Sequence, residues 1–334
     1  MENNNKMWAM LVHLSINISQ KHEKETFAEN FDDTFWDYVV EEAAKAGMNT
    51  ILLDVNDGVE FGSHPEIAKE GCWTRRRVRK EIARCRELGI TLIPKLNFSS
   101  THSHWLGEYR KMTSTPQYYR VCNDLIKEVY ELFDHPEYIH IGMDEEDASH
   151  SGGKYAVYRQ KDLYWHDIRF LIDCVADTGA KPWIWSCALF GATEEFQAHI
   201  DPEEVLISPW QYFAIYEENW MRIDSDQEYI DYYGKSPYKE MNLTYVEEDP
   251  YNVMYRKKAL PLLSDGYDYV PCVSVFNRCK HNTPDTVRYF KENAPDNQIV
   301  GFMTAPWFRT TWDKKEQFDE SLRLMKEAKE KYYG

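Results

Sequence analysis

The sequence predicts an α/β fold, a (β/α)8 TIM barrel that occupies residues 1–334 as a single domain. Roughly eight short apolar runs alternate with helical patterns along the chain, which is the element order of such a barrel. Several of these runs place Ile, Leu and Val at successive positions, as strands buried on both faces do. The length of 334 residues also suits a barrel, which commonly uses ~250 residues as one unit.

The expected strands are the apolar runs themselves. Each is short, and a longer segment with helical periodicity separates it from the next. The runs span residues 8–14, 49–55, 90–96, 138–142, 182–186, 205–209, 269–276 and 299–304.

Several expected helices have start and stop signals in the sequence. Thr34 and Thr74 can each cap a helix, and a glycine follows the end of both segments. Pro116 and Pro284 each follow a threonine, which places proline at a first helical position. The helices expected from these signals, with a final amphipathic one, span residues 35–46, 75–88, 116–133, 285–292 and 314–332.

A doubly wound open sheet is the alternative fold. It would favour a glycine-rich phosphate loop after the first strand, and residues 14–17 (LSIN) do not form one. Residues 212–249 are longer than an ordinary connection between a strand and a helix, so we expect an insertion there that decorates the catalytic face of the barrel.

Charge and hydropathy argue against two classes of partner. The net charge of −17 opposes binding to nucleic acid, and the one dense basic run, residues 75–80, begins a helix and is expected to be a solvated face. No apolar stretch approaches the ~18 residues that span a bilayer, and residues 8–14 are too short for the core of a signal peptide. We therefore expect no membrane partner and a cytoplasmic location for the sequence as it stands.

The cysteines and histidines give no sign of a cofactor. The seven cysteines are scattered, odd in number and without a C-x-x-C pair, which indicates a reducing compartment and neither a disulfide framework nor a zinc site. His102 and His104 form an H-x-H pair that could bind a metal, but no H-E-x-x-H pattern accompanies it. We expect neither a metal nor another cofactor.

Four acids directly after the strand at 138–142 are the strongest candidates for chemistry. Asp144, Glu145, Glu146 and Asp147 follow that strand, and barrel active sites are built at the carboxyl ends of strands. Crowded carboxylates repel one another, which raises the pKa of at least one of them, as a general acid requires. The alternative is a solvated acidic loop. Further polar residues end the second strand, Asp54 to Asp57, and the third, Asn97 followed by His102.

Tryptophan recurs at the ends of other expected strands. Trp185 follows the fifth strand, Trp210 the sixth and Trp307 the eighth. A single tryptophan is more often part of a core, but three at corresponding strand ends favour a shared aromatic pocket. A flat apolar wall beside carboxylates suits a pyranose ring, whose CH face stacks while its hydroxyls form hydrogen bonds.

With these residues in view, the chain resembles the family-20 glycoside hydrolases, the β-N-acetylhexosaminidases. Residues 140–145 (HIGMDE) are similar to the H-x-G-G-D-E signature of that family. Residues 89–94 (GITLIP) are similar to its G-I-x-V-I-P run, residues 48–57 to its M-N-x-x-x-x-H-x-x-D strand, and residues 301–307 to its G-x-x-x-x-x-W strand. The matches keep their order from about residue 8 to residue 312, and we expect no counterpart of the family's N-terminal β-rich domain in this sequence.

The resemblance implies a mechanism. Glu145 matches the general acid/base of the family, and Asp144 matches the carboxylate that orients the 2-acetamido group of the substrate. In that family the acetamido oxygen attacks the anomeric carbon, an oxazolinium intermediate forms, and the configuration is retained. Further matches to substrate-binding positions are Asp57, His102, Trp185, Trp210 and Trp307.

The sequence also departs from the family pattern. No match exists for the strand-one arginine that grips outer sugar hydroxyls, and Trp8 stands near its place. The P-E-x-D run reads Pro94-Lys95-Leu96-Asn97, so an amide, Asn97, is expected to contact substrate where the pattern has an acid. Tyr212 is our candidate for the tyrosine that contacts the acetamido carbonyl.

Arg309 is a further departure, because the family pattern has a glutamate there. A guanidinium only donates hydrogen bonds and suits an anion such as a carboxylate or a sulfate. We therefore expect either that Arg309 binds an acidic or modified terminal sugar, or that it pairs with an acid, for example in the cluster 144–147, and does not touch substrate.

Three functions fit the sequence. The first is an exo-acting, retaining glycosidase of the β-N-acetylhexosaminidase type with a carbohydrate substrate. The second is a related glycosidase with another sugar specificity, in which Asp144 has a different role. The third is a catalytically inactive carbohydrate-binding barrel; the missing arginine and glutamate favour it, whereas the adjacent pair Asp144 and Glu145 argues against it.

Overall fold

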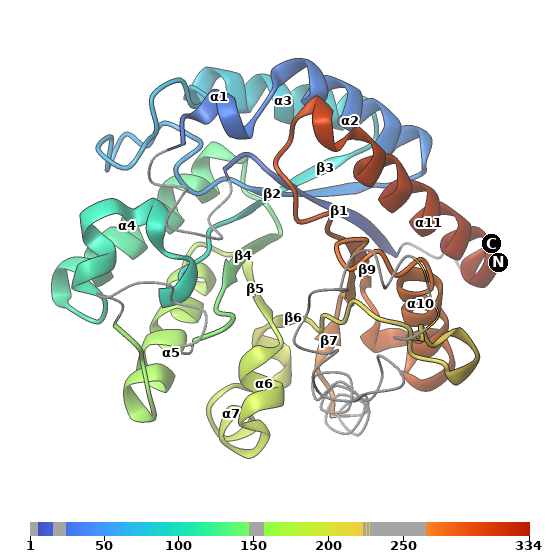
Figure 1. The fold of residues 1–334 in the computed structure, drawn as a ribbon. Helices are drawn as coiled ribbons and strands as arrows, with labels where there is room; N and C mark the ends of the chain where they lie inside the picture. Colours follow the sequence, from blue (N-terminus) through green and yellow to red (C-terminus); the bar gives the residue numbers. More distant parts are fainter. Residues whose placement is uncertain (1–5, 16–24, 147–156, 223–224, 226, 228–264) are drawn as a thin grey trace.

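The chain forms a barrel of parallel strands surrounded by helices (Figure 1). The computed structural model describes residues 6–15, 25–146, 157–222, 225, 227 and 265–334. Every strand pair in the sheet is parallel, and the order is β7-β6-β5-β4-β3-β2-β1-β9-β8. The strands are β1 (Met7–His13), β2 (Thr50–Asp54), β3 (Thr91–Lys95), β4 (Tyr138–Gly142), β5 (Lys181–Trp185), β6 (Leu206–Ser208), β7 (Asp268–Tyr269), β8 (Cys272–Val273) and β9 (Gly301–Thr304).

The two edges of this sheet belong to one stretch of chain, which closes the barrel. β7 pairs with β6 and β8 pairs with β9, and only residues 270 and 271 separate the two short strands. The Val270 amide donates to the Ile207 carbonyl, and the Met303 amide donates to the Pro271 carbonyl. Residues 268–273 therefore act as the seventh of eight barrel strands. This confirms the predicted (β/α)8 fold, and the run expected at 269–276 forms a strand only as far as Val273.

The helices surround the barrel on its outer side (Figure 1). Expected and observed bounds agree within three residues for the five predicted helices, four of them predicted from start and stop signals and one from its amphipathic pattern. The helices are α1 (Phe27–Asn30), α2 (Asp33–Lys45), α3 (Arg75–Glu87), α4 (Pro116–Leu132), α5 (Asp162–Ala176), α6 (Cys187–Gly191), α7 (Thr193–His199), α10 (Asn282–Asn293) and α11 (Lys315–Tyr333), with 3₁₀ turns η2 (Ser100–His102), η3 (His104–Met112), η4 (Pro202–Glu204), η5 (Glu217–Asn219), η10 (Asp296–Gln298) and η11 (Trp312–Lys314).

Two of the predicted helix starts need correction. Asp32, not Thr34, caps α2, because its carboxylate accepts hydrogen bonds from the amides of residues 34 and 35. Helix α10 begins at Asn282, so Pro284 is its third residue rather than its first. The cap at Thr74 is confirmed, since its hydroxyl accepts a hydrogen bond from the Arg77 amide. Pro116 is the first residue of α4, as predicted, and the Thr115 hydroxyl caps this helix by accepting a hydrogen bond from the Tyr118 amide.

Side-chain alternation along the strands builds the barrel interior in layers. Leu11, Leu52 and Ile93 belong to one buried cluster together with Trp183, Leu206 and Met303. Because successive side chains of a strand point to opposite faces, the residues two positions further along point into the same interior. On β1, β2 and β3 these are His13, Asp54 and Lys95, and the strand register aligns all three. An apolar interior is therefore topped by charged side chains at the carboxyl end of the barrel.

The insertion expected at residues 212–249 is described only in part. Residues 212–222, 225 and 227 lie within the described structure, and the remainder of that span lies outside it. Among the described helices, none combines the length and the apolar character needed to cross a bilayer.

The contact between β1 and β9 gives a test of the fold. Gly301 lies opposite Met7, and a Cβ at this glycine would overlap the Met7 carbonyl oxygen. We expect Gly301→Ala to lower the free energy of unfolding by about 2 kcal/mol or more, since overpacking of this kind costs ~1–3 kcal/mol. Denaturant unfolding measures it. Gly191→Ala is the control, because no atom lies within 4 Å of a Cβ there; equal effects of the two variants would contradict the close approach.

Candidate active site

A cavity of about 320 Å³ lies at the carboxyl ends of the barrel strands. Its lining comes from two groups of strands with different chemistry. Charged and polar side chains follow β1 to β4, while aromatic side chains follow β5, β6 and β9. The lining residues are His13, Asp54, Lys95, Asn97, His102, Asp144, Glu145, Trp185, Trp210, Tyr212, Phe276, Asn277 and Trp307.

An unusual backbone turn directs the carboxylates at the end of β4. Gly142, Met143 and Glu145 all have positive φ, at 74°, 66° and 53°. For the non-glycine residues Met143 and Glu145 this conformation costs ~1–3 kcal/mol each, and such strained residues cluster at functional sites. Only glycine fits at position 142, since a Cβ there would overlap the side chain of Asn97. The turn leaves both Asp144 and Glu145 on the cavity lining.

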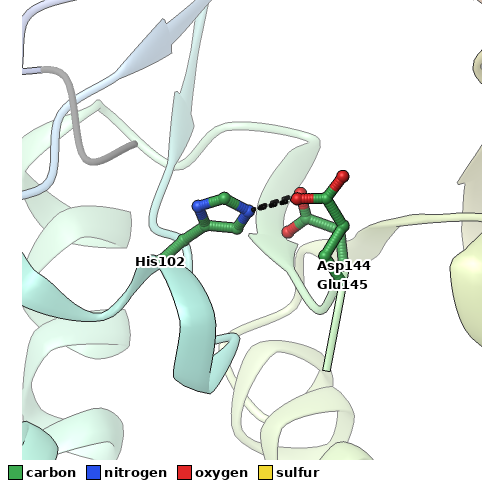
Figure 2. A group of neighbouring side chains, drawn as sticks. All are labelled: His102, Asp144 and Glu145. Atoms are coloured by element: carbon green, nitrogen blue, oxygen red, sulfur yellow. Dashed lines mark hydrogen bonds and ion pairs between the residues drawn. The ribbon is translucent and has the colours of Figure 1, made fainter. Parts of the chain in front are cut away.

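One imidazole contacts both of these carboxylates. His102 Nε2 lies 3.0 Å from Glu145 Oε2 and 3.4 Å from Asp144 Oδ2, and Figure 2 shows the ring directed from the loop after β3 at the pair after β4. Asn97 Nδ2 donates to Asp144 Oδ1 at 2.9 Å, and the Ser99 hydroxyl lies 3.3 Å from the same oxygen. Both carboxylate oxygens of Asp144 therefore have partners: Asn97 and Ser99 contact Oδ1, and His102 contacts Oδ2. His102 also contacts Glu145.

The charge of His102 follows from these neighbours. Burial lowers the pKa of its imidazole, but the charge of Asp144 and the hydrogen bond to Glu145 outweigh burial and raise that pKa to about 9. At neutral pH the imidazole ring of His102 is thus a cation that contacts both carboxyl groups. His102, Asp144 and Glu145 also offer ligand atoms within 4.8 Å of one another, as a metal site would. A metal bound there would need the neutral imidazole, so its binding would release the proton of His102.

Glu146, the other described acid of the cluster, has partners of its own outside this pair. Glu146 accepts a hydrogen bond from the Ser100 amide at 2.7 Å and pairs with Arg159 Nη2 at 2.6 Å. Arg159 is itself buried and also donates to the Phe98 carbonyl. Asp147 lies outside the described residues. Each described carboxylate at 144–146 thus has a cationic partner, His102 or Arg159, which differs from the mutual repulsion that the sequence led us to expect.

The aromatic side of the cavity is a continuous set of rings. Trp185 and Trp307 have ring centroids 5.7 Å apart, and Trp210 stacks on Tyr212 at 5.3 Å with an angle of 25° between the planes. Tyr212 also lies 6.3 Å from Trp307, and burial raises the pKa of the Tyr212 hydroxyl well above its ordinary value. These four rings line the same cavity as Asp144 and Glu145.

Two predicted site residues do not line the cavity. Asp57 is buried and accepts a hydrogen bond from the Ser15 hydroxyl. Arg309 has a side chain 43% exposed, lies 3.8 Å from Asp313 and donates to the Glu29 carbonyl. Its observed partner agrees with a structural ion pair, although the acid is Asp313 and not a member of the cluster 144–147. The structure brings together the other predicted site residues: Asn97, His102, Asp144, Glu145, Trp185, Trp210, Tyr212 and Trp307.

Sequence reasoning did not assign five of the lining residues to the site. His13, Asp54 and Lys95 are single charged positions within apolar runs, and Phe276 and Asn277 follow a strand that ends earlier than expected. The strand period of two was the signal that could have found the first three, because each lies two residues beyond an apolar interior position.

Comparison with known proteins shows which solved structures have a similar fold. No family model matches the chain, and no curated protein matches it significantly in sequence. Solved structures do match: the family-20 exo-β-N-acetylglucosaminidase of Vibrio harveyi superposes with a TM-score of 0.58 at 15% identity, over 96% of this chain and 54% of that one. The β-N-acetylhexosaminidase of Bacteroides fragilis gives 0.60 at 12% identity, over 96% of this chain and 65% of that one. Dispersin B gives 0.59 at 13% identity, over 98% of this chain and 100% of that one.

The fold is thus that of barrel enzymes whose site lies at the carboxyl ends of the strands. More particularly, it is the fold of the catalytic barrels of family-20 β-N-acetylhexosaminidases. The chain spans about half the length of the Vibrio harveyi enzyme, at 54%, and the whole length of Dispersin B, at 100%.

The pKa of His102 predicts how stability depends on pH. A pKa raised from about 6.5 to about 9 stabilises the folded state fully below pH 6.5, and this contribution disappears as pH rises through 9. Between pH 6 and pH 9.5 we expect the free energy of unfolding of the wild type to fall by up to about 3 kcal/mol relative to His102→Asn. Parallel denaturant titrations measure the difference. A difference that stays constant over this pH range would show that His102 is neutral beside the carboxylates.

Proposed function

We propose that this chain is a retaining glycoside hydrolase that removes a terminal N-acetylhexosamine from a β-linked carbohydrate, as a divergent member of glycoside hydrolase family 20. The observation that supports it most is the pair Asp144 and Glu145, contacted by the imidazole of His102 in a cavity that four aromatic rings also line. The fold shared with β-N-acetylhexosaminidases adds to that support.

Glu145 acts as the general acid and base in this proposal. Its proton goes to the glycosidic oxygen while the bond between that oxygen and the anomeric carbon breaks. The resulting carboxylate then takes a proton from the water that attacks the anomeric carbon in the second step. His102 holds the carboxylate at 3.0 Å, so its role is to position Glu145 and to stabilise its charge after the proton has left.

Asp144 acts on the 2-acetamido group of the substrate. The amide N–H donates to Asp144 while the acetamido oxygen attacks the anomeric carbon, and an oxazolinium ring forms. Positive charge develops on that ring, and a fixed carboxylate stabilises it electrostatically. Asn97 and Ser99 hold Asp144 in place with hydrogen bonds at 2.9 and 3.3 Å, which limits the reorganisation that the transition state requires.

The aromatic rings supply the sugar-binding surface. Trp185 is almost fully buried, and Trp307 and Tyr212 lie beside it. A pyranose can stack its CH face on such rings while its other groups face the charged groups of the cavity. A cavity of about 320 Å³ fits one sugar residue better than a chain, which agrees with exo action.

The role of Glu145 gives a prediction that depends on the leaving group. Glu145→Gln keeps the shape of the side chain and removes the acid. We expect kcat/KM to fall ~10²–10⁴-fold for an N-acetylhexosaminide with an alkyl or sugar leaving group, and much less for a nitrophenyl one. Glu146→Gln is the control, because Glu146 contacts Ser100 and Arg159 instead; its effect should be the same for both leaving groups. A small, equal effect of Glu145→Gln on both substrates would exclude this role.

The role of Asp144 gives a prediction about the 2-substituent. We expect the wild type to cleave a 2-acetamido glycoside with kcat/KM at least ~10³-fold above that of its 2-hydroxy counterpart, because only the former supplies the nucleophile. Asp144→Asn should lower kcat for the 2-acetamido substrate with little change in KM. Comparable cleavage of both glycosides by the wild type would instead indicate a glycosidase of other sugar specificity, and cleavage of neither would indicate a carbohydrate-binding barrel.

A further inference from the structure

The floor of the cavity contains a buried charged cluster that the proposed chemistry does not use. Lys95 Nζ donates to Asp54 Oδ2 at 2.8 Å, His13 Nδ1 lies 3.0 Å from the same oxygen, and Asn56 donates to Asp54 Oδ1 at 2.6 Å. His13, Asp54 and Lys95 are each 2–3% exposed. All three line the same cavity as Asp144 and Glu145.

Such a cluster is costly for the fold. Taking a lysine and a carboxylate out of water costs several kcal/mol per ion, and well-packed apolar residues in their place are often as stable. The interior directly below is apolar, with Leu52 and Ile93 two residues before Asp54 and Lys95. Packing alone does not require charge at this level of the barrel, so a ligand in the cavity is the natural partner for it.

The hydrogen-bonding capacity of the cluster points to a donor aimed at the ligand. An ammonium group has three donors, and one of the donors of Lys95 is used on Asp54. Burial raises the pKa of Asp54, but Lys95 and His13 outweigh burial and lower it to about 2, so that carboxylate stays ionised. The charge of Lys95 is therefore offset by the carboxylate of Asp54, which favours an uncharged hydroxyl over a sulfate or a carboxylate as its ligand.

The position of the cluster indicates which hydroxyls these are. The leaving group must extend toward solvent, so the sugar enters with the opposite edge of its ring first. Asp144 and Glu145 act at C2 and C1, which leaves the edge with the C3 and C4 hydroxyls as the part that reaches the floor. We infer that Lys95, held by Asp54, is a specificity-determining residue that donates a hydrogen bond to the C3 or C4 hydroxyl of the terminal sugar. This inference rests on the proposed function.

A thermodynamic cycle tests this inference by removing the Lys95 ammonium group and one sugar hydroxyl, separately and together. The probes are the thiazoline derived from N-acetylglucosamine and its 3-deoxy and 4-deoxy forms, with binding measured by calorimetry on the wild type and on Lys95→Met. We expect the wild type to bind one deoxy form about 10- to 100-fold more weakly than the parent, as the loss of a hydrogen bond to a charged group predicts. In Lys95→Met that difference should shrink to less than about threefold.

Two further variants keep the test decisive. The double variant Asp54→Asn/Lys95→Met removes both charges. It replaces Lys95→Met in the binding measurements if that single variant leaves Asp54 unpaired and does not fold. Lys181→Met is the matched control, because Lys181 pairs with Asp268 at 2.9 Å between the first residues of β5 and β7, at the other end of the barrel; it should keep the wild-type preference.

The outcomes separate this inference from the function on which it rests. A deoxy penalty that is unchanged without Lys95, or no penalty in the wild type, overturns the role of Lys95 and leaves the glycosidase proposal standing. Tighter binding of a 6-sulfated thiazoline than of the parent, dependent on Lys95, would mean that the cluster binds an anion and would overturn it too. Failure of the parent thiazoline to bind the wild type contradicts the proposed function itself.

Discussion

The contact of His102 with two carboxylates is the interaction on which the site depends. It links the turn after β4 to the loop after β3, and it places a positive charge 3.0 Å from Glu145 and 3.4 Å from Asp144. Without that charge two adjacent carboxylates would repel each other in a partly buried cavity. The positive φ of Gly142, Met143 and Glu145 directs both side chains toward the imidazole, so backbone strain and electrostatics support the same arrangement.

The parallel register of the barrel explains why chemically different residues meet in one cavity. Pairing of β1 with β2 and of β2 with β3 aligns His13, Asp54 and Lys95 above an apolar interior. Strand β5 ends in Trp185, and Trp307 follows β9, the neighbour of β1, so that its ring centroid lies 5.6 Å from that of His13. A cavity that combines charged groups with aromatic rings suits a ligand with polar groups and an apolar face, as a pyranose has.

The sequence predicted the barrel well because its signals are local and repeated. Buried parallel strands appear as apolar runs, and each of the eight expected runs contains strand in the structure. Helix α5 was not among the helices predicted, since it begins after Lys161 with φ of 52° and no capping side chain. The seventh strand ends at Val273, before the end of its apolar run, because the chain bends at residue 275 and turns at residues 276 and 277.

The sequence predicted the site residues that lie at the ends of strands. It did not predict residues whose position depends on contacts between distant parts of the fold. Asp144, Glu145 and three tryptophans were found from strand ends alone. The family pattern led to Arg309, but its side chain lies 3.8 Å from Asp313 outside the cavity, and the position of a long flexible side chain cannot be read from spacing. Lys95 was not assigned a role in the site because a single lysine in an apolar run is no signal by itself. Its role is visible only in the structure, where Asp54 Oδ2 on the neighbouring strand lies 2.8 Å from Lys95 Nζ.

The stereochemistry of hydrolysis tests the central claim most directly. Proton NMR of the first sugar released from a β-linked N-acetylhexosaminide distinguishes the two anomers before they interconvert. Attack by the acetamido group followed by water gives two inversions at the anomeric carbon, so the account predicts the β-anomer as the first product. First release of the α-anomer would mean direct attack by water, and it would contradict the role of Asp144 in orienting the acetamido group.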